Sequence, residues 1–74
     1  KGLLMSQIVQ EKLNIFTINI VVNKLYTKQN DKLIISRLKN QISNEIEIKI
    51  NHIKNIPLNN NGKFQAVISK LNND

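Results

Sequence analysis

The sequence of 74 residues contains no cysteine, no tryptophan, a single proline and only two glycines. Without cysteine, a disulfide framework and a thiolate metal site are both excluded. This absence fits a reducing cytoplasm, which is the location we expect. The single histidine, His52, does not make a metal site, and we expect no metal ligands. No segment has the ~18 apolar residues that a membrane span requires, so we expect no membrane association. The N-terminal stretch lacks the pattern of a signal peptide.

Acidic residues are also scarce, with 5 against 11 basic ones, for a net charge of +6. A basic small domain raises the question of a nucleic-acid partner. However, the lysines are spread singly along the chain, and one tyrosine and two phenylalanines provide little surface on which bases could stack. Nucleic-acid binding is therefore the alternative function, that of a small basic α/β module. A purely structural dimerisation domain is a third hypothesis.

Alternating apolar residues predict strands at Ser6–Lys12, Ile15–Val22 and Glu45–Ile53, with Leu13-Asn14 as a tight connection between the first two. The middle segment is rich in β-branched residues, as a half-buried strand prefers. His52 falls in the inward register and reads as a partly buried histidine with a local hydrogen-bond partner. These strands predict a small three-stranded sheet.

Between the second and third strands the apolar period becomes helical, from Lys28 to about Ile42, and Thr27 is a candidate N-cap. After residue 63 a second helical spacing appears and predicts a short C-terminal helix or irregular tail, with fraying over residues 71–74. The residues with this spacing are Phe64, Val67, Ile68 and Leu71. The expected fold is therefore α+β, with the order β-β-α-β and one main packed helix.

The stretch IPLNNNGKFQAV joins the third strand to this tail. Asn61-Gly62 is a turn signal, and a hairpin with a primed turn is the simplest local interpretation. A phosphate-binding loop is excluded, because that motif needs a glycine five residues before its Gly-Lys pair and Ser or Thr after it. Pro57 and Phe64 occupy those positions.

The segment from Pro57 to Phe64 matches in spacing a Pro-x-Thr-x-x-Gly-Lys-Phe motif, and VISKL follows it. With QIVQEK near the start and EIEIKINHI in the middle, the chain resembles the C-terminal small domain of adenylate-forming ligases. The branch that it resembles is the phenylacetate–coenzyme A ligase family, including relatives in capsular polysaccharide biosynthesis. Asn59 replaces the threonine of the motif, but asparagine also bonds nearby backbone groups and shapes turns.

This resemblance implies that Lys63 is catalytic, and that Pro57, Asn59, Asn61 and Gly62 form the loop that supports it. It further implies that residues 1–74 are a single domain, the lid fragment of a larger ligase, without the hinge and the ATP-binding domain. The implied ligands of the complete enzyme are ATP with Mg²⁺, coenzyme A and a small carboxylic acid, and the implied partner is the N-terminal adenylating domain. The fragment alone would bind none of them and would be inactive. Lacking cover from an upstream helix, the apolar rows Phe16, Ile18, Ile20 or Ile46, Ile48, Ile50 would be partly bare and would favour a homodimer.

Overall fold

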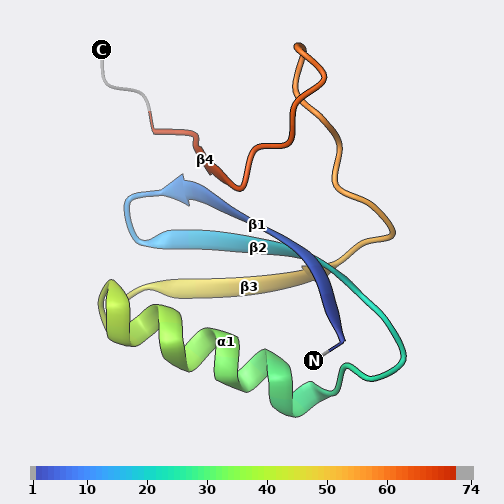
Figure 1. Cartoon of the computed structure of the whole chain (residues 1–74). Coiled ribbons are helices and arrows are strands. Elements are labelled where there is room, and N and C mark those ends of the chain that lie inside the picture. Colours follow the sequence, from blue (N-terminus) through green and yellow to red (C-terminus); the bar gives the residue numbers. More distant parts are fainter. Residues whose placement is uncertain (1, 72–74) are drawn as a thin grey trace.

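The computed structural model describes residues 2–71, which form one four-stranded sheet and one long helix (Figure 1). The α+β fold class is confirmed, but the sheet has one strand more than the sequence predicts. In chain order the elements are β1 (Leu3–Lys12), β2 (Ile15–Val22), α1 (Lys28–Gln41), β3 (Glu47–His52) and β4 (Val67–Ser69).

Strands β1 and β2 form an antiparallel hairpin in which Ile8 lies opposite Ile18, and Leu13-Asn14 connects them as expected. β1 begins at Leu3, so the predicted start at Ser6 is wrong. The first residues of β1 do not alternate in polarity, and their side chains are exposed. Pairing with the end of β2 makes them a strand, because the backbone N–H and C=O groups find partners there.

Strand β3 runs parallel to β2, with Ile50 opposite Ile18, and helix α1 makes the connection between them. Under this helix Phe16, Ile18 and Ile20 are 7%, 2% and 0% exposed. Of the two rows expected to be partly exposed, this one is therefore excluded, because α1 of the same chain covers it. In the second row Ile46 is buried, whereas Ile48 and Ile50 are half-buried. Self-association through the sheet stays a prediction.

Thr27 is the N-cap of α1, as predicted, and its backbone N–H donates to Asn30 Oδ1 at 2.8 Å. The helix ends at Gln41, and Ile42, the expected last residue, is its C-cap. Ile34 and Leu38 line a hollow together with Ile8 and Ile18 of the hairpin. This hollow identifies the sheet face that α1 covers.

Strand β4 replaces the predicted C-terminal helix, which is wrong. Val67, Ile68 and Ser69 pair in parallel with β1, with Ile68 opposite Val9. Two hydrogen bonds of 2.8 and 2.9 Å extend this ladder, from Ile8 N to Ala66 O and from Lys70 N to Gln10 O. The open edge of β1 offers backbone partners, and Val-Ile suits a strand better than a helix. Residues 72–74 of the expected fraying tail lie outside the described part of the chain.

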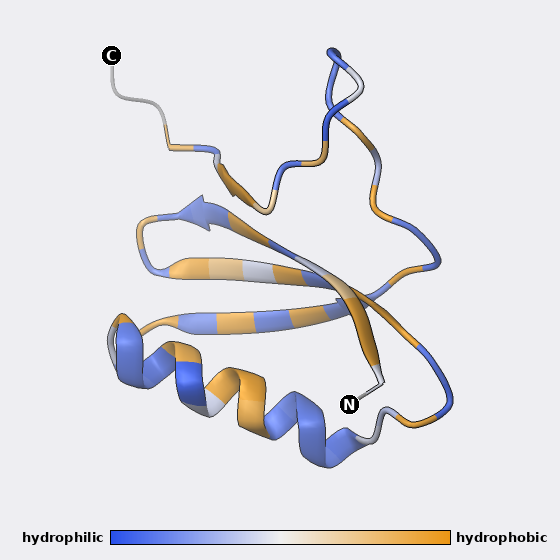
Figure 2. Ribbon diagram, in the orientation of Figure 1, coloured by the Kyte–Doolittle hydropathy of each residue, from blue (hydrophilic) through white to orange (hydrophobic). Residues whose placement is uncertain are grey.

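The strand order is β3-β2-β1-β4, so β3 and β4 lie at opposite edges of the sheet. Residues 53–66 must therefore connect one edge to the other, and they form the long orange segment of Figure 1. Ile56 anchors this connection, since only 5% of its surface is exposed. The far tip of the segment is hydrophilic (Figure 2), and it carries the Asn-Gly-Lys sequence.

Candidate functional site

The tip of the long connection is a closed turn from Asn59 to Lys63, which we call the lysine loop. Asn59 N donates to Lys63 O at 2.8 Å, and Gly62 N donates to Asn59 O at 2.9 Å. Gly62 has φ +74°, the left-handed region that glycine enters without steric cost. Asn61 has no positive φ, so the primed turn is wrong. Within residues 53–66 no strand flanks the turn, so it closes without a hairpin ladder.

The side chain of Asn59 holds the inside of the lysine loop. Its Oδ1 accepts two backbone N–H groups, from Asn61 and from Lys63, each at 2.9 Å. This pattern is an Asx turn, in which a short amide side chain imitates a backbone carbonyl. The expectation that asparagine shapes the turn in place of threonine is confirmed.

Lys63 itself projects from this turn with an exposed side chain. The ion pairs within residues 2–71 join Lys70 to Glu11 and His52 to Asp31, and Lys63 takes part in neither. Pro57 is exposed too, and it follows buried Ile56 directly. The five predicted site residues thus lie together in or just before one turn, which is closed by hydrogen bonds to its backbone and exposes the Lys63 side chain. Their catalytic role stays a prediction.

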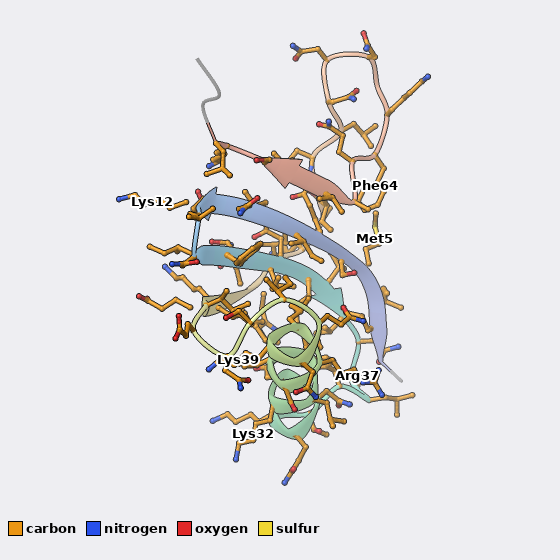
Figure 3. All side chains as sticks on the ribbon, turned by 90° about the vertical axis from the view of Figure 1, so that its left-hand side faces the viewer. Met5, Lys12, Lys32, Arg37, Lys39 and Phe64 are labelled. Atoms are coloured by element: carbon orange, nitrogen blue, oxygen red, sulfur yellow. The ribbon has the colours of Figure 1, made fainter. Side chains whose placement is uncertain are left out.

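Two contacts to β1 fix the returning end of the lysine loop. Gln7 Nε2 donates to Gln65 O at 2.8 Å, and Ile8 N donates to Ala66 O at 2.8 Å. Continuing the parallel register of Ile8 with Val67 backwards places Phe64 opposite Met5, and Figure 3 shows these two side chains next to each other. Phe64 and Met5 are 41% and 37% exposed, so both side chains lie at the surface beside the base of the loop.

Gln7 is a site residue that the sequence interpretation missed. It is 5% exposed and shares a sheet face with Val9, which is also buried. The one signal in the sequence is that Gln7 is an amide two residues before Val9, on a strand face where an apolar residue would be expected. Its hydrogen-bond partners are Asn19 of β2 and the carbonyl of Gln65, and neither is near Gln7 in the sequence.

A second polar cluster lies where the start of α1 meets the end of β3. The Tyr26 hydroxyl donates to Asp31, and His52 Nε2 is 3.4 Å from Asp31 Oδ1. Burial, and then the hydrogen bond to Asp31, raise the pKa of Tyr26. The His52 side chain is 46% exposed, and its partner is distant in sequence. The expected hydrogen-bond partner is present, but it is distant in sequence rather than local, and His52 is exposed because it ends an edge strand of the sheet.

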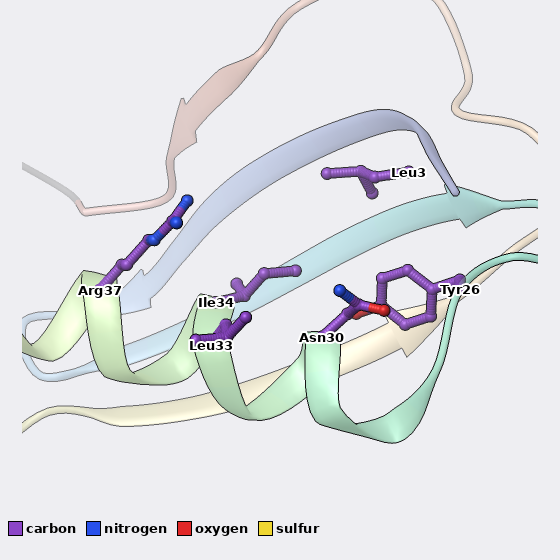
Figure 4. A pocket seen from close by; sticks show the side chains of 6 residues that line it. All are labelled: Leu3, Tyr26, Asn30, Leu33, Ile34 and Arg37. Atoms are coloured by element: carbon purple, nitrogen blue, oxygen red, sulfur yellow. The ribbon is translucent and has the colours of Figure 1, made fainter. Parts of the chain in front are cut away.

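The structure also has a hollow of about 220 Å³ between α1 and the start of β1 (Figure 4). Its lining is half apolar and includes Leu3, Tyr26, Asn30, Leu33, Ile34 and Arg37. It lies on the helix side of the sheet, whereas the lysine loop lies beyond β1 (Figure 1). Within residues 2–71 no group of three acidic or histidine side chains could hold a metal ion. No helix in that range is long and apolar enough to cross a membrane.

The fold and the site together define a small α+β domain that presents one lysine on a hydrogen-bonded turn beyond the edge of its sheet. The family model described as the CapK C-terminal domain matches residues 1–70. The chain therefore belongs to the CapK C-terminal domain family, and the resemblance to a domain of capsule-related enzymes is confirmed. A C-terminal domain implies a partner domain that precedes it. No curated protein and no solved structure matches the chain.

Proposed function

We propose that this domain is the lid of an ATP-dependent, adenylate-forming carboxylate–coenzyme A ligase. It delivers Lys63 to an adenylation site in the preceding domain. The observation that carries the proposal is the lysine loop, which exposes one cation while four hydrogen bonds close the turn behind it. Family membership supports the capsule-related enzyme and the partner domain. The ligase chemistry, the acid and coenzyme A belong to the proposal, as does a cytoplasmic location.

In the proposed first step a substrate carboxylate attacks the α-phosphorus of ATP, and pyrophosphate leaves. Both reactants are anionic, and charge builds up on the phosphoryl oxygens in the transition state. The Lys63 ammonium group would lie against those oxygens and stabilise that charge. A lysine suits this role, since it is a compact charge on a flexible four-carbon stem.

The other loop residues would serve the reach of Lys63. A Cβ at Gly62 would meet nothing within 4 Å in this domain, so the glycine is required by its φ rather than by packing. That open space leaves room for the surface of the preceding domain to approach the backbone. Pro57 fixes the direction in which the chain leaves Ile56.

In the proposed second step a thiol, that of coenzyme A, attacks the acyl carbonyl, and AMP leaves. The lid rotates between the two steps, so that Lys63 withdraws and another face of the domain meets the site. This chain contributes no metal-ligand cluster in its described residues. The proposal therefore assigns Mg²⁺, ATP and coenzyme A to the preceding domain.

The test replaces Lys63 with alanine in the longer protein that includes the preceding domain. ATP–pyrophosphate exchange should fall ~10²–10³-fold, the typical loss for one charge-stabilising group. Transfer from a supplied acyl-adenylate to the thiol should stay near its original rate. Lys12→Ala is the matched control, because Lys12 is also exposed but lies at the far end of β1 (Figure 3). An equal loss in both steps would refute the assignment, as would exchange by the 74-residue chain alone.

Basic side chains on α1 support the second candidate, nucleic-acid binding. Lys32 and Lys39 point away from the sheet (Figure 3), and the net charge of the chain is +6. Titration of the domain with RNA at two salt concentrations separates the candidates, because phosphate contacts predict a steep loss of affinity with salt. A lid function predicts no such binding.

A further inference from the structure

Gln7 is the one buried polar side chain among residues 2–71, with 5% of its surface exposed. A buried amide is costly unless its donor and acceptor are both paired. Here both are paired: Nε2 donates to Gln65 O at 2.8 Å, and Oε1 accepts from Asn19 Nδ2 at 3.1 Å. One of these partners is the backbone of the segment that returns from Lys63.

Three amide side chains form a continuous row on the sheet face opposite α1. Asn19 lies opposite Gln7 in the antiparallel pair, and Asn51 lies opposite Asn19 in the parallel pair. Asn51 Nδ2 donates to Asn19 Oδ1 at 3.0 Å. The row therefore crosses β3, β2 and β1 and ends at the carbonyl of Gln65.

The direction of every hydrogen bond in this row follows from its last member. The Gln65 carbonyl can only accept, so Gln7 must present Nε2 to it and turn Oε1 towards Asn19. Asn19 must then present Nδ2 to Gln7, which leaves its Oδ1 for Asn51. Asn19 and Asn51 thus keep the donor end of Gln7 aimed at the loop.

We propose that Gln7 is a positioning residue for Lys63: its buried amide, oriented by Asn19, clamps the Gln65 carbonyl and sets where the lysine loop points. This inference rests on the proposed function of Lys63. The anchored carbonyl is two residues from Lys63, whereas the hydrogen bonds of the tip in the described part of the chain all stay within the turn. Loss of the clamp leaves the fold in place and widens the range of Lys63 positions.

The experiment is a double-mutant cycle in the longer protein, with the variants Gln7→Glu and Lys63→Ala. Gln7→Glu retains the size of the side chain and an acceptor for Asn19, but in its ionised form it has no donor for the Gln65 carbonyl. We expect about tenfold slower ATP–pyrophosphate exchange, as for loss of one well-placed hydrogen bond. In the Lys63→Ala background the same change should have no further effect, because Gln7 acts only through Lys63. Transfer from a supplied acyl-adenylate should be unchanged.

Hydrogen-exchange mass spectrometry on the same proteins gives a readout independent of activity. Gln7→Glu should speed exchange in peptides covering residues 57–66 and leave β2 unchanged. Asn51→Ala, which leaves the clamp itself intact, is the control and should change the loop less. If Gln7→Glu also opens the sheet, Gln7→Asn replaces it, since its neutral amide is one methylene too short to reach Gln65.

Two results overturn the proposal. One is an unchanged rate of hydrogen exchange in residues 57–66 of Gln7→Glu while the sheet stays intact. The other is a double variant in which Gln7→Glu slows pyrophosphate exchange as much as it does in the presence of Lys63. Failure of the proposed function looks different: Lys63→Ala alone would leave pyrophosphate exchange intact. In that case the hydrogen-exchange measurement still decides whether Gln7 anchors the loop.

Discussion

Replacing Asn59 with alanine should loosen the lysine loop without unfolding the domain. The substitution removes the Oδ1 atom that accepts the backbone N–H groups of Asn61 and Lys63, both at 2.9 Å. A typical hydrogen bond stabilises by about 0.5–1.5 kcal/mol, so two of them stabilise the closed turn by about 1–3 kcal/mol. Because the turn is exposed and water can replace the lost partner, we expect the lower half of that range.

This loss should appear as faster amide exchange at Lys63 and Asn61, by about tenfold, measured by NMR on the 74-residue chain. The bond from Gly62 N to the backbone of Asn59 remains, so the amide of Gly62 should change less. Asn59→Asp keeps a side-chain acceptor and should retain slow exchange. The matched control is Asn60→Ala, an exposed neighbour in the same turn. Equal exchange at Lys63 in the variants of Asn59 and Asn60 would refute the reasoning.

Two further perturbations follow from the structure. Gly62→Ala should destabilise the domain by about 1–2 kcal/mol in urea unfolding, since φ +74° is strained for alanine although the space is open; an unchanged free energy of unfolding would contradict this. The hydrogen bond from Lys70, and then that from Thr17, lower the pKa of Glu11 below 4.5. The pairing of ionised Glu11 therefore stabilises the fold above pH 4.5, and this stabilisation is lost as the pH falls through the lowered pKa. An NMR titration of the Glu11 carboxyl with a midpoint at or above 4.5 would refute that pairing.

The local sequence pattern was sufficient to predict the strand and the helix that each bury one face. In Ile15–Val22 the apolar residues Phe16, Ile18 and Ile20 alternate with other residues, and the segment is β2 within the same bounds. The helix begins at Lys28 as predicted, because Thr27 and the change of period mark its start. In both segments the residues that determine the structure are close together in the sequence.

Long-range pairing explains the misses. The residues Val67–Ser69 have a helical spacing with their neighbours, yet they form a strand because β1 offers an unpaired edge. Gln7 looked like an ordinary strand residue, since its partner Gln65 is 58 residues away. The lysine loop was located from motif spacing alone, but the anchoring of its returning end depends on that same distant contact.

The parallel pairing of β4 with β1 has a consequence for the order of assembly. β1 and β2 are joined by a two-residue connection, whereas β4 meets β1 only after the whole intervening chain has been closed into a loop. Closing so long a loop costs more entropy and slows the step. We therefore expect the hairpin to form early and the lysine loop to gain its anchor last. A nascent or proteolysed chain that lacks Val67–Ser69 would keep its buried core residues but would not hold Lys63 in a fixed position. The lysine is therefore positioned only once the chain is synthesised through β4.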